Sequence, residues 1–171
     1  MNAMIRRFDA ALIDLDGTLL DTAHDLANAA NRMLAALGRP ARDLRTLTSY
    51  IGKGIPRIVH RAITGDMNAD ADPQTFARGL ELYERFYAEE SGASAPVFDG
   101  VVDGLRAFQN AGIKLACVTN KTTRFTGALL ERTGLAHWFE LVVCGDTLER
   151  RKPDPLPFTH ACKTLAAAPN R

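Results

Sequence analysis

The segment that decides the fold is Ala10–Ile13 (AALI) followed directly by Asp14–Asp21 (DLDGTLLD). An apolar run of this length, placed before a Gly-Thr break, is typical of a buried parallel strand. Open α/β sheets bind ligands at the carboxyl ends of such strands. Asp14 and Asp16 are separated by one residue, so they lie on one face of an extended chain, and Gly17 permits an immediate turn. The segment therefore predicts a strand that delivers two carboxylates to a ligand-binding edge.

Two neighbouring carboxylates repel each other unless a cation lies between them or one of them takes up a proton. Asp14 and Asp16 therefore indicate either a site for a hard metal ion with oxygen ligands or a nucleophile beside an acid/base group. A strand-end turn with two solvated acids is a third interpretation, which this motif alone leaves open.

The composition is that of one ordinary domain, or a core with a modest insertion, in a chain of 171 residues with 46% apolar content. The net charge of +1, without an extended basic run, argues against nucleic acid as a partner. Residues 1–8 are basic but are followed by Asp9 and a short apolar run, which predicts neither a signal peptide nor a membrane span. Cys117, Cys144 and Cys162 form no Cys-x-x-Cys pair, and they indicate reduced thiols in a cytoplasmic protein.

Helical spacing of apolar residues predicts an all-helical block after the first strand, with Thr22 and Asp25 as an N-terminal capping pair for its first helix. The expected helices of this block cover 26–37, 44–49, 56–63 and 73–92. Past Pro96 the pattern alternates again, with helices expected over 101–111 and 123–133 and strands over 113–118 and 141–144. Strand–helix–strand order predicts right-handed crossovers and a parallel sheet.

These elements predict an α/β protein with a three-layer, Rossmann-like core and an inserted small helical cap. The core is expected to comprise residues 1–20 and 96–171, and the cap residues 21–95. An insertion directly after the first strand-end loop can close over a site as a lid.

Polar residues follow all three predicted strands: Asp14 and Asp16, then Thr119 and Asn120, then Lys152 in the loop after the third strand. The carboxyl ends of parallel strands meet at one edge, so these side chains are expected to converge. A carboxylate nucleophile, a hydroxyl, an amide and a lysine are the groups that phosphoryl transfer through an aspartyl-phosphate requires.

In this order the motifs resemble those of the haloacid dehalogenase superfamily of phosphatases. The first motif matches Asp14-x-Asp16-Gly17-Thr18, the second Thr119-Asn120, and the third Lys152-Pro153-x-Pro155. The segments around these motifs, together with the helical insertion, are most similar to the phosphoglycolate phosphatase branch of that superfamily.

The resemblance implies an activity and a set of roles. Asp14 would be the nucleophile, and Asp16 would protonate the leaving alcohol and then activate water. Magnesium would be held by the Asp14 side chain and the Asp16 backbone carbonyl. The other implied site residues are Thr119 and Lys152 as catalytic groups, and Gly17, Thr18 and Asn120 as substrate-binding groups. The expected substrate is a small phosphorylated metabolite, 2-phosphoglycolate, with a sugar-phosphate phosphatase or mutase as the alternative.

In the expected cap, Gly52-Lys53-Gly54 precedes a helix that starts near Pro56. A glycine-bounded loop at a helix N-terminus suits an anion, so Lys53 is a candidate for binding the substrate carboxylate. An ordinary turn between helices, with a solvated lysine, is the equally weighted alternative.

The chain departs from the family at its end. The family's fourth motif, Gly-Asp followed by another acid, should come after Lys152, but the sequence ends at Arg171 without it. Gly145-Asp146 precedes Lys152 and is interpreted as part of the loop that leads to the third motif. A truncated core would bind magnesium weakly and show little activity, and the unpaired edge of strand 10–13 would favour self-association. An inactive binding or regulatory fragment is the alternative of another class.

Overall fold

The structure of the chain is a computed structural model, which describes residues 8–92 and 95–168. The chain forms two compact units. One unit contains residues 1–21 and 96–171, and the other contains residues 22–95. The functional assignment of the first as a catalytic core and the second as a cap stays a prediction.

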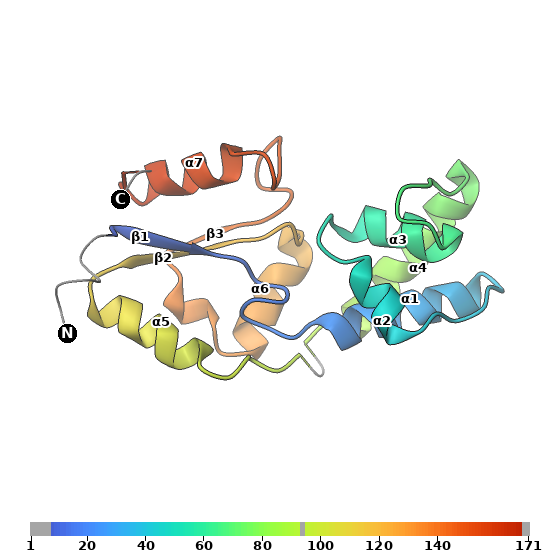
Figure 1. Cartoon of the computed structure of the whole chain (residues 1–171), viewed down its shortest axis with the longest axis horizontal. Helices are drawn as coiled ribbons and strands as arrows, with labels where there is room; N and C mark the ends of the chain where they lie inside the picture. The colour runs from blue at the N-terminus through green and yellow to red at the C-terminus, as the bar shows by residue number, and fades with distance from the viewer. Residues whose placement is uncertain (1–7, 93–94, 169–171) are drawn as a thin grey trace. The chain divides into compact units, whose positions relative to one another are not determined.

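A parallel sheet lies at the centre of the first unit (Figure 1). Its strands are β1 (Ala10–Ile13), β2 (Lys114–Val118) and β3 (Leu141–Val143), hydrogen-bonded in the order β1-β2-β3. Both pairings are parallel. The predicted α/β class with a parallel sheet is confirmed.

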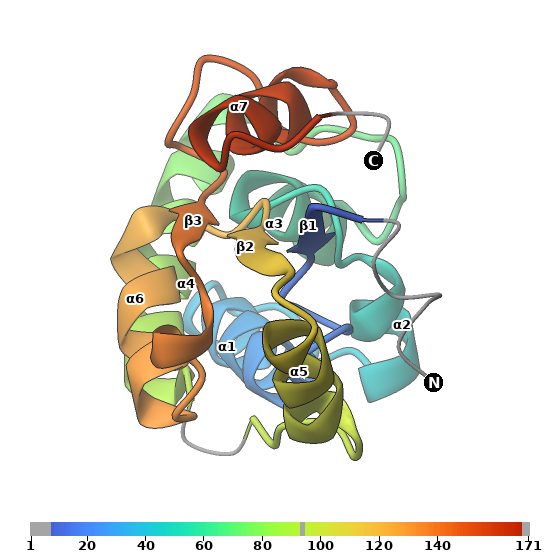
Figure 2. The same cartoon turned by 90° about the vertical axis from the view of Figure 1, so that its left-hand side faces the viewer.

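Helices cover both faces of this sheet. Helix α7 (Leu156–Thr164) lies on one face, and α5 (Val101–Asn110) and α6 (Thr123–Arg132) lie on the other (Figures 1 and 2). The unit therefore has three layers, as the strand–helix alternation predicted. A 3₁₀ helix, η2 (Ala136–Trp138), precedes β3 and was not predicted, because an element of three residues has no periodicity to detect.

The central strand explains the apolar core of this unit. Residues 115–118 of β2 are each at most 2% exposed, because helices cover both faces of the strand. Ala161 of α7 and Leu165, just past its end, belong to the same buried cluster as the end of β2. β1 is only half-buried, and among the described residues it pairs with β2 alone. Self-association through its other edge stays a prediction.

The second unit is a bundle of helices. These are α1 (Ala23–Ala36), α2 (Leu44–Ser49), α3 (Ile55–Thr64) and α4 (Pro73–Glu90). The side chains of Asp43 and Asp72 accept hydrogen bonds at the starts of α2 and α4, where helix N-termini have unsatisfied amides. Fully buried side chains such as Met33, Val59 and Tyr83 form the interior of the unit. No helix in the described part of the chain has the length and apolarity that crossing a membrane requires.

Thr22 is the N-cap residue of α1, as expected, but the expected side-chain cap is not formed: within the described residues, the Thr22 side chain makes no capping hydrogen bond to this helix. Asp25 is 1% exposed, and its Oδ2 accepts a hydrogen bond of 2.9 Å from the amide of Gly92, just past the end of α4. A buried carboxylate needs a donor, and the backbone after α4 supplies it. Asp25 therefore joins the two ends of the helical unit.

Candidate active site

The first motif forms a tight turn after β1. Leu15 is fully buried, and its carbonyl accepts hydrogen bonds from the amide of Leu19 at 2.9 Å and that of Leu20 at 3.1 Å. Gly17 has φ +76°, which is the left-handed region that favours glycine, and its amide donates to the Leu20 carbonyl. The turn leaves Gly17 and Thr18 exposed next to the two aspartates.

Lys152 reaches the first aspartate from the loop after β3. Its Nζ lies 2.8 Å from Asp14 Oδ1 and also donates to the carbonyl of Val118, the last residue of β2, at 2.8 Å. The carbonyl of Lys152 accepts a hydrogen bond of 3.1 Å from the side chain of Asn120. The structure thus brings together Asp14, Asn120 and Lys152, although their chemical roles stay predictions. The peptide bond between Lys152 and Pro153 is cis.

A second lysine, Lys121, contacts the other aspartate. Its Nζ lies 2.8 Å from Asp16 Oδ1, and its side chain is only 3% exposed. The amide of Lys121 donates to Thr119 Oγ1 at 3.1 Å, so Thr119 belongs to the same cluster. Lys121 was not among the site residues predicted from the sequence. The available signal was its position directly after Thr119-Asn120, but a strand-end lysine usually points to solvent.

The site therefore contains two pairs of opposite charge, Lys152 with Asp14 and Lys121 with Asp16. Each lysine offsets the repulsion that two close carboxylates would otherwise feel. The field of these charges extends to Cys117, which is fully buried in β2. Burial raises the pKa of the Cys117 thiol to about 12, and the negative charge of Asp14 adds to this effect. The thiol therefore stays protonated, and all three cysteines of the chain are free.

The loop after β3 packs tightly against the second motif. A Cβ at Gly145 would overlap the carbonyl oxygen of Asn120, so the close approach requires glycine. Asp146 Oδ1 accepts hydrogen bonds of 2.8 Å from both the amide and the hydroxyl of Thr123, at the start of α6. Burial acts to raise the pKa of Asp146, but these hydrogen bonds outweigh it and hold the pKa below its ordinary value. Asp146 thus caps a helix within the loop that leads to Lys152.

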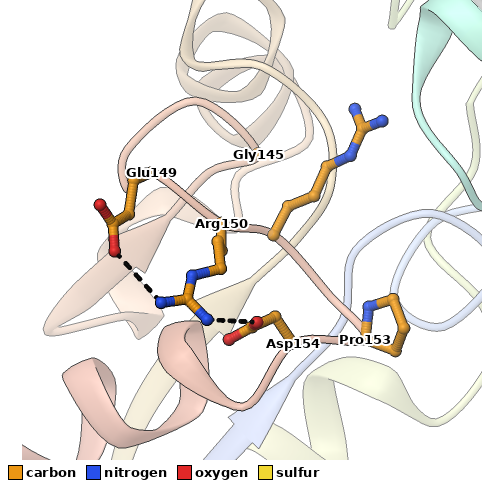
Figure 3. Close-up of a pocket in the computed structure, with 6 residues that line it drawn as sticks. Gly145, Glu149, Arg150, Pro153 and Asp154 are labelled. Carbon is orange, nitrogen blue, oxygen red and sulfur yellow. Dashed lines mark hydrogen bonds and ion pairs between the residues drawn. The ribbon is translucent and has the colours of Figure 1, made fainter.

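An open, polar cavity of about 760 Å³ lies beside Lys152. Its lining residues are Gly145, Glu149, Arg150, Arg151, Pro153 and Asp154 (Figure 3). The guanidinium of Arg150 lies 3.6 Å from Glu149 and 3.2 Å from Asp154, between the two carboxylates. Asp154 also accepts a hydrogen bond from the amide of Leu156 at the start of α7. No sequence motif predicted this cavity.

Lys53 belongs to the helical unit, where it is exposed in the loop between α2 and α3. Its glycine neighbours both have positive φ, +112° at Gly52 and +80° at Gly54. Contact between Lys53 and a substrate stays a prediction.

The chemistry of the oxygen donors in the first motif suits magnesium. Carboxylate and carbonyl oxygens are the ligands that this ion prefers, and Asp14 with Asp16 supplies both kinds. Within the described residues, no group of three or more His, Cys, Asp or Glu side chains could hold a metal ion. Magnesium binding by Asp14 and Asp16 stays a prediction.

The chain matches a known protein family. Residues 8–171 match the family of haloacid dehalogenase-like hydrolases, and the chain belongs to this family. The chain is 52% identical to a phosphoglycolate phosphatase of Thiobacillus denitrificans over 94% of the chain and 70% of that protein. It is 47% identical to a phosphoglycolate phosphatase of Nitrosospira multiformis over 94% of the chain and 71% of that protein.

A solved structure supports the same assignment. A predicted phosphoglycolate phosphatase from Haemophilus somnus superposes with a TM-score of 0.85 at 27% identity, over 93% of the chain and 72% of that protein. The resemblance drawn from the motifs is therefore confirmed.

Proposed function

We propose that this protein is a phosphatase that hydrolyses a small phosphate monoester, 2-phosphoglycolate, through a covalent phosphate on Asp14. The observation that carries the proposal is the 2.8 Å contact between Asp14 and Lys152 at the end of β1. It combines an exposed nucleophile with a cation that can balance the charge of a phosphoryl group. The names of the relatives support the substrate.

The reaction follows from the two aspartates. In the first step an oxygen of Asp14 forms a bond to phosphorus while the ester P–O bond breaks, and Asp16, which must start this step protonated, gives its proton to the departing alcohol. In the second step water attacks the phosphorus, the bond to Asp14 breaks, and Asp16 takes the proton from the water. The products are the free alcohol and inorganic phosphate.

The surrounding groups would bind and orient the phosphate. Lys152 balances the negative charge on the transferred group, while the Thr119 hydroxyl and the Asn120 amide orient its oxygens. The exposed backbone at Gly17 and Thr18 can approach the phosphate closely.

Magnesium is the proposed cofactor. The Asp14 carboxylate and the Asp16 carbonyl would hold the ion, which would neutralise charge on the phosphoryl oxygens.

Two further proposals concern the setting of the reaction. Lys53 would bind the substrate carboxylate, so Lys53→Ala should raise KM for 2-phosphoglycolate about tenfold. It should barely change KM for a phosphate ester without a carboxylate. We place the protein in the cytoplasm because its three cysteines are free.

The test is a phosphatase assay with 2-phosphoglycolate and a panel of sugar phosphates, with magnesium or with a chelator. The chain should be assayed beside a version that carries the expected fourth motif. Faster turnover of 2-phosphoglycolate than of any sugar phosphate, lost on chelation, would support the proposal. Preference for a sugar phosphate would support the alternative phosphatase or mutase, and no turnover by either version would contradict the enzymatic function.

A further inference from the structure

The two lysines of the site differ in how they are held. Lys152 is 17% exposed and contacts Asp14, which is itself 42% exposed. Lys121 is 3% exposed and contacts Asp16, which is 18% exposed. A lysine is almost never this deeply buried unless it is paired, because desolvation of its charge is costly. The Lys121–Asp16 pair is therefore the more enclosed of the two.

The backbone of Lys121 is anchored on both sides. Its amide donates to Thr119 Oγ1 at 3.1 Å, and its carbonyl accepts from the amide of Gly145 at 2.8 Å. The amide of Thr119 in turn donates to the carbonyl of Val143 at 2.9 Å. These bonds tie Lys121 to the ends of the central strand β2 and of its neighbour β3. Asp16, in contrast, lies in the turn after the edge strand β1.

We propose that Lys121 is a positioning residue that fixes the carboxyl group of Asp16 for proton transfer to the leaving alcohol. The proposal rests on the phosphatase function given above. Proton transfer requires the acid within hydrogen-bond reach of the leaving oxygen, and a displacement of about 1 Å can cost about 100-fold in rate. Lys121 contacts one oxygen of Asp16 from a fixed backbone, which restricts the side-chain torsions of the aspartate.

The role predicts a dependence on the leaving group. Lys121→Met keeps an unbranched side chain that is one heavy atom shorter, and it removes the charge. It should lower kcat for 2-phosphoglycolate about 100-fold, because the alkoxide leaves only with a proton. The loss with 4-nitrophenyl phosphate should stay below about tenfold, since that leaving group needs no proton. KM should change little for either substrate.

The matched control is Lys152→Met, which changes the lysine that contacts Asp14. This change should lower kcat for both substrates by the same factor, because the nucleophile takes part in the hydrolysis of every phosphate ester. In an Asp16→Asn background, Lys121→Met should add no further loss. Equal losses on the two substrates in the Lys121 single variant would overturn the proposal. Thermal unfolding of each variant shows whether it folds, and Lys121→Gln replaces Lys121→Met if the latter does not.

A crystal structure of the Lys121 variant separates this proposal from the phosphatase function. If the unaltered protein turns over neither ester, the phosphatase function fails, and the positioning role is decided by this structure alone. The proposal requires the Asp16 side chain to change its torsions or become disordered while the contact between Asp14 and Lys152 persists. An Asp16 side chain that keeps its conformation in the variant would overturn the positioning role.

Discussion

Buried and half-buried cations contact different partners in the two units of the chain. In the α/β unit, Lys121 and Lys152 contact carboxylates. In the helical unit, Arg61 is 4% exposed and donates to the main-chain carbonyls of Tyr50 and Met67, both at 2.9 Å. A cation that donates hydrogen bonds to main-chain carbonyls of its own unit stabilises the loops that carry them. A cation that contacts carboxylates at the end of a strand lies where open α/β sheets bind their ligands, so it can take part in a reaction there.

A second arginine in the helical unit behaves like Arg61. Arg42 Nε donates to the carbonyl of Ala62 at 2.7 Å, near the end of α3. Its guanidinium lies against Gly65, where a Cβ would come within 2.8 Å of it. Gly65 has φ +77° and ends the helix in the left-handed conformation. Arg42 therefore stabilises the C-terminal end of α3. Substitutions of cations in the helical unit are accordingly expected to lower stability, whereas substitutions in the α/β unit are expected to lower catalytic activity.

The largest effect is expected for Asp14→Asn. Without a carboxylate nucleophile, kcat should fall at least about 1000-fold on every phosphate ester, while the melting temperature changes little. Steady-state kinetics and thermal unfolding measure the two effects. Residual turnover within tenfold of the unaltered protein would show that another residue is the nucleophile.

Asp16→Ala should follow, with an effect that depends on the substrate. Loss of the general acid should slow alkyl phosphates about 100- to 10,000-fold and activated aryl phosphates much less. A plot of rate against the pKa of the leaving alcohol measures this dependence. Equal losses on both classes would instead indicate a structural or metal-positioning role.

Arg61→Met tests the helical half of the comparison. The change leaves the carbonyls of Tyr50 and Met67 without their donor, which should lower the free energy of unfolding by about 2–3 kcal/mol. Arg78→Met is the matched control, because the Arg78 side chain is 56% exposed. This change should lower the free energy of unfolding by less than about 0.5 kcal/mol. The ratio of alkyl to aryl phosphate turnover should stay unchanged in both variants. A changed ratio in Arg61→Met would contradict the comparison.

The smallest effect concerns Asp146, whose hydrogen bonds from Thr123 hold its pKa below the ordinary value. A carboxylate with a lowered pKa stabilises the fold above its unfolded pKa, and this contribution is lost as pH falls through the folded pKa. Asp146→Asn should therefore lower stability by about 1 kcal/mol near neutral pH. The difference should shrink below about pH 4. Denaturant unfolding across this range measures it, and a difference that is independent of pH would argue against the capping role.

The local periodicity of apolar residues was sufficient to predict most of the strands and helices. The apolar run Ala10–Ile13 and the alternation after Pro96 predicted the parallel strands, because buried strands and amphipathic helices differ in period. The four helices of the second unit also follow the periodicity of their sequence. The motif order placed Asp14 after the first strand and Lys152 in the loop after the third, and the structure has their side chains in contact.

The sequence by itself thus determined the strands and the main helices, their order, and the family to which the chain belongs. Only the tertiary structure decided that Asp25 joins Gly92, that Gly145 must lack a side chain, and that Lys121 points inward to Asp16. Periodicity and capping act between residues a few positions apart, whereas Lys121 and Asp16 are 105 positions apart. Contacts between such distant residues depend on strand register and on how the loops pack. A buried polar group has lost its contact with water, so its partner is whichever group the tertiary fold places beside it.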